Sequence, residues 1–318
     1  MDAIRTEALT KHYSVGFWRP RPYLALEGLT LSVGQGEVFG FLGPNGAGKT
    51  TTLKLLMQLI YPTSGSAHIL GMPVGSPDVK RRIGYLPENP YFYDHLTAEE
   101  LLEYFASLFG YGAADRRQRA SRLLDEVGIG AERRLQLRKF SKGMLQRVGI
   151  AQALLNEPEV VFFDEPMSGL DPLGRREIRQ LILRLRDRGC TVFFSSHVLA
   201  DAEALCSRVA IVARGRLVAQ GPLAEILAFQ VHGWELVMSH VPQGALECAL
   251  KDGRVSKALP LGQDRYALDL PLATPPDGLM ADLTAAGAQL VSLNPVRETL
   301  EDFFVRQVAA VKADRGLE

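Results

Sequence analysis

Short apolar runs alternate with amphipathic segments along the first two thirds of the chain. The runs EVFGFLG (37–43), EVVFFD (159–164) and CTVFFSS (190–196) are nearly continuous in apolar residues, which is typical of parallel strands buried on both faces. The segment LALEGLTLSV (24–33) alternates instead, and it predicts an antiparallel flank. Up to about residue 225 the pattern therefore predicts an α/β fold.

Two helices are predicted beside these strands. The segment KTTTLKLLMQLI (49–60) follows a glycine-rich loop and has the composition of a helix. A second helix begins after Asp171 at the N-cap, has Pro172 at its first position and ends before Gly189. Both helices connect predicted strands, as the crossovers of a parallel sheet must.

After about residue 230 the pattern changes. The strand-like segments WELVMSH, RVSKALPL, RYALDLPL and QLVSLNPV are interleaved with the helix-like segments PDGLMADLTAAG and TLEDFFVRQVAAV. This order predicts a small α+β domain of ferredoxin-like type at 230–318, after a first domain at 1–225. The second domain carries no chemical motif, so we expect a regulatory or dimer-stabilising role for it.

Composition and charge restrict the location and the partners. The chain has 318 residues, and Lys+Arg and Asp+Glu both total 36, which gives no basic excess for binding nucleic acid. No run of eighteen apolar residues occurs, and the N-terminus MDAIRTEALT lacks the apolar core of a signal peptide. Cys190, Cys206 and Cys248 lack metal-ligand spacing, so we expect buried, reduced thiols in a cytoplasmic protein.

The segment GPNGAGKT fits the pattern G-x-x-x-x-G-K-[ST] between a predicted strand and a predicted helix. Its glycines let backbone N–H groups surround phosphate oxygens, and the helix directs its positive end there. Lys49 is expected to reach the β- and γ-phosphates, and Thr50 to ligate Mg²⁺. A glycine-rich turn without a ligand is the alternative, and the flanking elements disfavour it. The predicted ATP-binding residues here are Gly43, Pro44, Asn45, Gly46, Ala47, Gly48, Lys49, Thr50 and Thr51.

Polar side chains follow two of the predicted strands. Asp164 ends one strand, where a carboxylate beside a phosphate loop suits Mg²⁺ bound through water. Glu165 is next, where it could polarise the water that attacks the γ-phosphate. His197 follows the neighbouring strand and could contact the γ-phosphate. Adjacent acids usually form a solvated loop, and a histidine at a strand end is usually structural, but the phosphate loop favours the functional interpretation.

These features, with three further ones, resemble the ATP-binding subunit of ABC transporters over residues 1–225. The resemblance implies an ABC-type P-loop ATPase domain with an antiparallel β flank and a helical subdomain. The segment FSKGMLQR (140–147) resembles the signature motif of that family, and SGLD (168–171) resembles its D-loop. Tyr13 in KHY resembles the aromatic residue that stacks on adenine. The forms SKGMxQR and GLDPLGR, with a tail ending in LEDFF, resemble the branch that serves ABC-2 type exporters.

The resemblance implies a head-to-tail homodimer in which each signature closes the ATP site of the other subunit. Ser141, Gly143 and Asp171 would contact nucleotide there, while Lys49, Glu165 and His197 would be catalytic. The resemblance also implies an integral membrane permease as partner, at the cytoplasmic face of the cell membrane.

The sequence departs from the family pattern at two places. Phe140, Lys142 and Met144 replace family residues in the signature, although the serine and glycine remain. Glu88 stands where the family places a glutamine that contacts ATP and Mg²⁺. The aromatic residues at 91–93 either pack inside the domain or receive a helix of a membrane subunit.

Two segments and two other functions stay open. The segment FWRPRPY (17–23) is either a solvated loop with tucked aromatic residues, a lining for the base or a partner contact. A soluble ABC ATPase acting on nucleic acid or ribosomes is the alternative function, disfavoured by the single cassette and zero net charge. A small GTPase is disfavoured because no guanine-specific motif is present.

Overall fold

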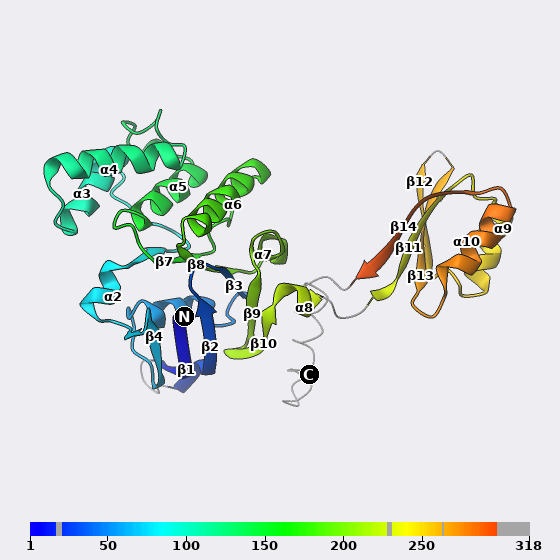
Figure 1. Ribbon diagram of the computed structural model, residues 1–318, viewed down its shortest axis with the longest axis horizontal. Coiled ribbons are helices and arrows are strands. Elements are labelled where there is room, and N and C mark those ends of the chain that lie inside the picture. Colours follow the sequence, from blue (N-terminus) through cyan, green and yellow to red (C-terminus); the bar gives the residue numbers. More distant parts are fainter. Residues whose placement is uncertain (17–20, 228–230, 263, 298–318) are drawn as a thin grey trace. The chain divides into compact units, whose positions relative to one another are not determined.

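A six-stranded sheet with the strand order β10-β9-β3-β8-β7-β6 is the centre of residues 1–223 (Figure 1). All neighbouring strands are parallel except β10 and β9. Every residue of β3, β7 and β8 is buried, which explains why these strands are continuous apolar runs in the sequence. The strands are β3 (Val38–Leu42), β6 (Ile83–Leu86), β7 (Val160–Asp164), β8 (Thr191–Ser196), β9 (Arg208–Ala213) and β10 (Arg216–Pro222).

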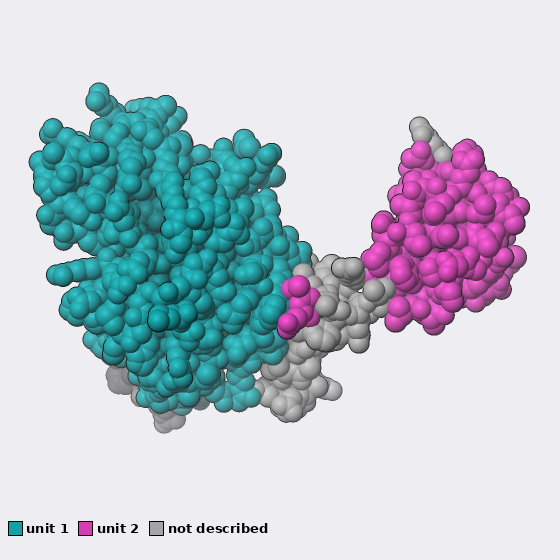
Figure 2. All heavy atoms as spheres, viewed as in Figure 1, with its two compact units in different colours: residues 1–223 teal, residues 224–318 magenta. Residues whose placement is uncertain are grey.

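The structure is a computed structural model that describes residues 1–16, 21–227, 231–262 and 264–297. It divides the chain into two compact units, 1–223 and 224–318 (Figure 2).

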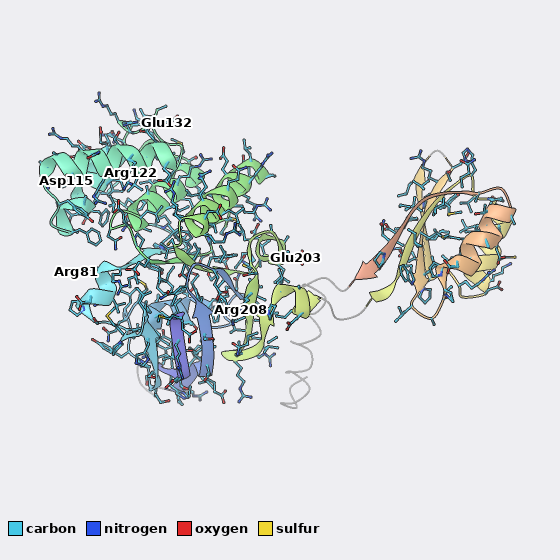
Figure 3. All side chains as sticks on the ribbon, in the orientation of Figure 1. Arg81, Asp115, Arg122, Glu132, Glu203 and Arg208 are labelled. Atoms are coloured by element: carbon cyan, nitrogen blue, oxygen red, sulfur yellow. The ribbon has the colours of Figure 1, made fainter. Side chains whose placement is uncertain are left out.

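A four-stranded antiparallel sheet with the order β2-β1-β4-β5 forms the predicted flank. Arg208 of β9, labelled in Figure 3, joins the two sheets, because its Nη2 donates to the carbonyl oxygen of Ser32 in β2 at 3.3 Å. Its Nη1 lies 2.9 Å from Oε1 of Glu37, which immediately precedes β3. The strands are β1 (Asp2–Val15), β2 (Arg21–Gly34), β4 (Ser64–Ile69) and β5 (Met72–Pro73).

Helix α1 (Lys49–Leu56) contacts strands of both sheets. Its Leu53 and Leu56 join one apolar core with Phe39 and Phe193 of the parallel sheet. Each fully buried side chain of this size contributes about 2 kcal/mol. The helix ends four residues before the predicted end at residue 60. Gln58 has a φ of 51°, and Pro62 follows, so the helix cannot continue.

Helices cover the other face of the parallel sheet and form the predicted helical subdomain (Figure 1). α6 and α7 contact β3 and β8, while α3, α4 and α5 pack against one another, with α5 against β6. These helices are α3 (Ala98–Leu108), α4 (Ala113–Glu126), α5 (Lys142–Ala153), α6 (Pro172–Asp187) and α7 (Leu199–Leu205). Two more are α2 (Pro77–Arg81), whose Val79 belongs to the core with α1, and α8 (Leu223–Leu227), which spans the boundary of the two units.

The second unit contains an antiparallel sheet with the order β12-β13-β11-β14. Strands and helices follow one another as β-α-β-β-α-β, which is the ferredoxin-like arrangement. The segment TLEDFFVRQVAAV lies outside the described residues. The elements are β11 (Val231–Ser239), α9 (Gln243–Lys251), β12 (Lys257–Gly262), β13 (Arg265–Pro271), α10 (Pro276–Ala285) and β14 (Gln289–Arg297).

The expectation that all three cysteines are buried is wrong for Cys248. Cys190 and Cys206 are free and buried, and burial raises the pKa of Cys190 to about 12, so this thiol stays protonated. Cys248 is exposed. It lies on α9, a helix that the sequence did not predict, whose buried residues are Leu246 and Ala249. Cys248 projects from a different side of that helix.

Candidate nucleotide-binding site

The glycine-rich loop between β3 and α1 is shaped by contacts that only glycine permits. A Cβ on Gly43 would lie 2.3 Å from the carbonyl oxygen of Val212, and a Cβ on Gly48 would lie 2.6 Å from that of Ala25. Gly48 also has a φ of 108° and caps α1 without any side-chain hydrogen bond. The first N–H groups of the helix are therefore free of a side-chain cap, which suits an anion.

The ammonium group of Lys49 lies within this loop. Its Nζ donates to the carbonyl oxygen of Gly43 at 2.7 Å and to that of Pro44 at 3.3 Å. It also lies 3.1 Å from Oε1 of Glu165, and both side chains are buried. This Oε1 accepts no hydrogen bond, so its contact with the ammonium is electrostatic. A buried carboxylate oxygen without a hydrogen bond marks a place for a further polar ligand, such as water.

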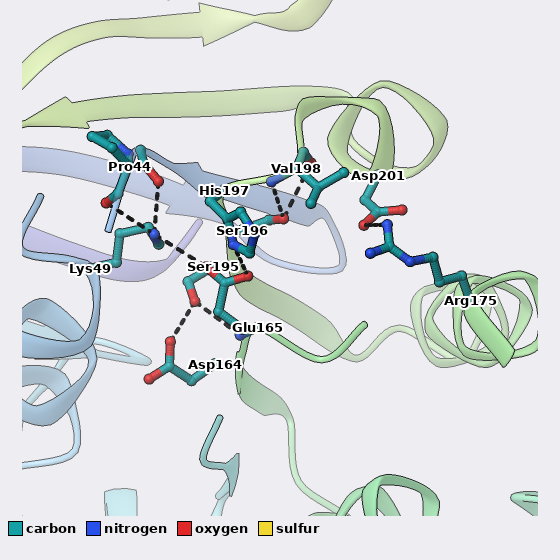
Figure 4. A network of polar contacts seen from close by, with 11 residues as sticks. Pro44, Lys49, Asp164, Glu165, Arg175, Ser195, Ser196, His197, Val198 and Asp201 are labelled. Carbon is teal, nitrogen blue, oxygen red and sulfur yellow. Dashed lines mark hydrogen bonds and ion pairs between the residues drawn. The ribbon is translucent and has the colours of Figure 1, made fainter. Parts of the chain in front are cut away.

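Glu165 is held between the ends of two parallel strands. Its Oε2 lies 2.8 Å from Nδ1 of His197, and its backbone N–H donates to Oγ of Ser195 at 3.1 Å (Figure 4). Its φ is 50°, a left-handed conformation that is rare outside glycine and often occurs at functional sites. Ser195 was not predicted, although its position beside the strand end was visible in the sequence.

Oxygen atoms that suit a divalent cation surround the start of α1. Burial raises the pKa of Asp164, while the hydroxyl groups of Ser195 and Thr50 act in the opposite direction. Ser195 Oγ donates to Oδ1 of Asp164 at 2.6 Å. The described residues contain no group of three or more His, Cys, Asp or Glu that could hold a metal. Mg²⁺ does not need one, because it combines one or two protein ligands with phosphates and waters. The donor set therefore fits Mg²⁺ bound together with a nucleotide.

A cavity of about 370 Å³ opens over the loop and contains the predicted residues Glu88 and Glu165 in its wall. Tyr13 is not among its lining residues. Tyr23, which pairs with Tyr13 across β1 and β2, lines the cavity and is 52% exposed. The sequence had left the base lining by segment 17–23 open as one of three interpretations. The lining residues are Tyr23, Ala25, Pro44, Asn45, Gly46, Gly48, Lys49, Thr50, Thr51, Glu88 and Glu165.

Ser141, Gly143 and Asp171 lie together around a second cavity of about 520 Å³, which we call the signature cavity. Ser141 caps α5 by accepting a hydrogen bond from the N–H of Met144 at 3.3 Å. Asp171 caps α6 by accepting one from the N–H of Gly174 at 2.8 Å. The two cavities have no lining residue in common. Within one subunit, the structure therefore does not bring the signature residues to the phosphate loop.

A glycine-rich loop at the end of a central parallel strand, followed by a helix and faced by two acids, defines a P-loop nucleotide-binding protein. The family model described as "ABC transporter" matches residues 26–168. Solved structures of ABC transporter ATP-binding subunits are also similar to this chain. The chain is 33% identical to an ATP-binding subunit of an ABC transporter, with a TM-score of 0.62, covering 71% of this chain and 92% of that one. A dimeric bacterial ABC transporter cassette is 28% identical, with a TM-score of 0.64, covering 69% and 98%.

Curated relatives extend the similarity beyond the first unit. An uncharacterized ABC transporter ATP-binding protein of Synechocystis is 46% identical, covering 96% of this chain and 85% of the relative. The daunorubicin/doxorubicin resistance ATP-binding protein of Streptomyces peucetius is 32% identical, covering 99% and 95%. A fluoroquinolones export ATP-binding protein of Mycobacterium tuberculosis is 44% identical, covering 69% and 70%. The chain belongs to the ATP-binding proteins of ABC transporters and is an ATPase of that family.

Proposed function

We propose that this chain is the ATP-hydrolysing subunit of an ABC-2 type membrane exporter, which it drives through ATP-dependent closure of a homodimer. The names of similar proteins support export, because they include fluoroquinolone export and daunorubicin/doxorubicin resistance. None of the described helices has the length and apolar character needed to span a bilayer. The proposal therefore includes a separate integral membrane permease and a position at the cytoplasmic face of the cell membrane.

The phosphate loop supplies the ground-state contacts in this proposal. Backbone N–H groups of the loop and the first turn of α1, at residues 45–51, and the ammonium of Lys49 hold the β- and γ-phosphates. Glu165 accepts the proton of the attacking water, and His197 holds the Glu165 carboxylate through the 2.8 Å contact. The oxygen of water then bonds to the γ-phosphorus, the bond to the ADP oxygen breaks, and ADP and phosphate are released.

Thr50, Asp164 and Glu88 are the residues that we propose to hold Mg²⁺, with Asp164 acting through water. Bound Mg²⁺ would neutralise charge on the β- and γ-phosphate oxygens. Glu88 and Thr50 both line the phosphate-loop cavity. Compared with the glutamine of the family, Glu88 adds a negative charge, so a cation is needed between it and the phosphates.

The observation that best supports the proposed dimer is the separation of the phosphate-loop cavity from the signature cavity. Ser141 and the first N–H groups of α5 form a second helix end suited to an anion, and Lys142 adds a positive charge there. No residue of that cavity lines the cavity of the phosphate loop. A second subunit placed head to tail brings the helix end of each subunit to the γ-phosphate of the other.

Mixed subunits test this arrangement. Lys49→Ala and Ser141→Arg subunits are each expected to be inactive as homodimers. In the mixture both defects fall in one composite site, so the other site is intact and ATP-dependent closure should return. If each site lies within one chain, every subunit stays defective and nothing returns.

A cross-link gives a second readout that does not depend on coupling between sites. Ser141→Cys combined with Asn45→Cys, in a chain whose three native cysteines are replaced, should form a disulfide between chains when ATP is added. Non-reducing electrophoresis would then show a species of twice the chain mass. Disulfides that form only within one chain would contradict the proposed dimer.

A further inference from the structure

One side chain connects two segments that the proposed mechanism uses separately. Nε of Arg175, on α6, donates to the carbonyl oxygen of Leu170 in the SGLD segment at 3.4 Å. Nη1 of the same guanidinium lies 3.3 Å from Oδ2 of Asp201 on α7. α7 begins two residues after His197. Arg175 therefore joins the SGLD segment to the helix that follows His197.

The carboxylate of Asp201 is buried, so its pair with Arg175 is not a surface ion pair. It is only 4% exposed, and burial raises its pKa while Arg175 and Arg179 act in the opposite direction. A buried carboxylate that loses its cation is left uncompensated, which is far more costly than losing a surface ion pair. The pair beside the Glu165 and His197 contact is visible in Figure 4.

The turn between His197 and α7 is closed by hydrogen bonds. Ser196 Oγ accepts from the N–H of Val198 at 2.9 Å and donates to its carbonyl oxygen at 3.2 Å. These bonds fix the backbone on both sides of His197 to Val198, the residue that precedes the first turn of α7. The imidazole in turn contacts Glu165 at 2.8 Å.

The SGLD segment lies at the cavity of the signature residues. Gly169, Leu170 and Asp171 line that cavity together with Ser141 and Gly143. A ligand bound at the N-terminus of α5 would therefore also contact the SGLD segment. The carbonyl oxygen of Leu170 in that segment accepts the hydrogen bond from Arg175.

We propose that Arg175 is a positioning residue that couples occupation of the signature cavity to the position of His197 in the same subunit. The inference rests on the proposed function, in which the ligand at that cavity is the ATP held by the other subunit. A ligand at that cavity would then stabilise the SGLD segment and, through Arg175 and α7, the contact of His197 with Glu165 in the same subunit.

Steady-state kinetics and ATP binding of the full chain test this role. Arg175→Ala should lower kcat about tenfold to a hundredfold, the scale of a misplaced catalytic group. The Kd for ATP should stay within about twofold, because the phosphate loop is not touched. The Tm should fall, because the buried Asp201 loses the Arg175 cation and keeps only that of Arg179. Arg176→Ala is the matched control, since Arg176 is the exposed neighbour on the same helix. A kcat of Arg175→Ala equal to that of Arg176→Ala would overturn the inference.

A double-mutant cycle separates positioning from general support of the fold. Asp201→Asn should lower kcat by a similar factor, and adding it to Arg175→Ala should have little further effect. Additive losses in kcat, or a Kd for ATP that rises together with the loss in kcat, would overturn the inference. Arg175→Lys keeps a cation for Asp201 without the planar donor to Leu170, and its kcat should be intermediate.

ATP-dependent dimerisation distinguishes the inference from the proposed function. In a Glu165→Gln background, both the parent and its Arg175→Ala derivative should dimerise with ATP. A monomeric parent would contradict the proposed dimer itself. A dimeric parent combined with unaltered kcat in Arg175→Ala would remove only the role of Arg175.

Discussion

Glu165 combines three features at the residue scale: a left-handed backbone, a contact with His197 and an oxygen without a hydrogen bond. Glu165→Gln keeps the shape and removes the charge of the base. We expect turnover to fall by about a hundredfold or more while ATP binding remains. Phosphate release and the Kd for ATP measure the two effects, and Glu203→Gln on the exposed side of α7 is the control. Turnover near wild type would assign the base to another residue.

Tyr13 and Tyr23 are alternative candidates for the aromatic residue that stacks on the adenine base. The resemblance selects Tyr13, whereas Tyr23 is the residue that lines the cavity. Because stacking on a base contributes about 1–3 kcal/mol, Tyr23→Ala should raise the Kd for ATP about fivefold or more. Inorganic triphosphate has no base, so its binding should not change. An unchanged Kd for ATP in Tyr23→Ala, with a raised one in Tyr13→Ala, would assign the base to Tyr13 alone.

At the scale of elements, the segment before α3 carries an exposed aromatic group. Tyr91 is 100% exposed and Tyr93 is 54% exposed, so the interpretation that these rings pack inside the domain is wrong for both. Tyr93 lies edge-on to Tyr104 of α3, with ring centroids 6.1 Å apart. Phe92 differs, because it is half-buried beside Gly149 of α5. We propose residues 88–96 as the docking surface for the permease.

Tyr91→Ala with Tyr93→Ala tests this surface. Both rings are exposed, so the free energy of unfolding should change by less than about 0.5 kcal/mol for each replacement. Co-purification with the permease should weaken strongly, while ATP hydrolysis of the isolated chain is retained. Tyr61→Ala removes another exposed tyrosine, with an exposed fraction of 70%, and should leave co-purification intact. Unfolding of the double variant would instead assign both rings a structural role.

At the scale of the whole molecule, the two units have separate apolar cores. Every residue that lines the phosphate-loop cavity and the signature cavity belongs to the first unit. A chain truncated after residue 229 should therefore bind ATP with a Kd within about twofold of the full chain. Dimer closure should require more ATP if the second unit stabilises the dimer. A folded truncated chain that has lost ATP binding would contradict this division of roles.

Features that depend on local chemistry could be predicted from the residues along the chain. Continuous apolar runs defined β3, β7 and β8, because strands buried on both faces have no polar side. Asp171 is a helix cap as predicted, since a cap needs only a neighbouring N–H group. The glycine pattern likewise located the loop between β3 and α1.

Contacts between residues far apart in the sequence could not be predicted, because they depend on how the whole chain packs. The 3.1 Å approach of Lys49 to Glu165 and the Arg175–Asp201 pair depend on the order of strands in the sheet, which no local pattern encodes. The exposure of Tyr91 could not be predicted either, because an aromatic residue has the same sequence signal in a core and at an interface. The separation of the two cavities is a long-range property of the same kind, since it depends on how α5 and α1 pack on one sheet.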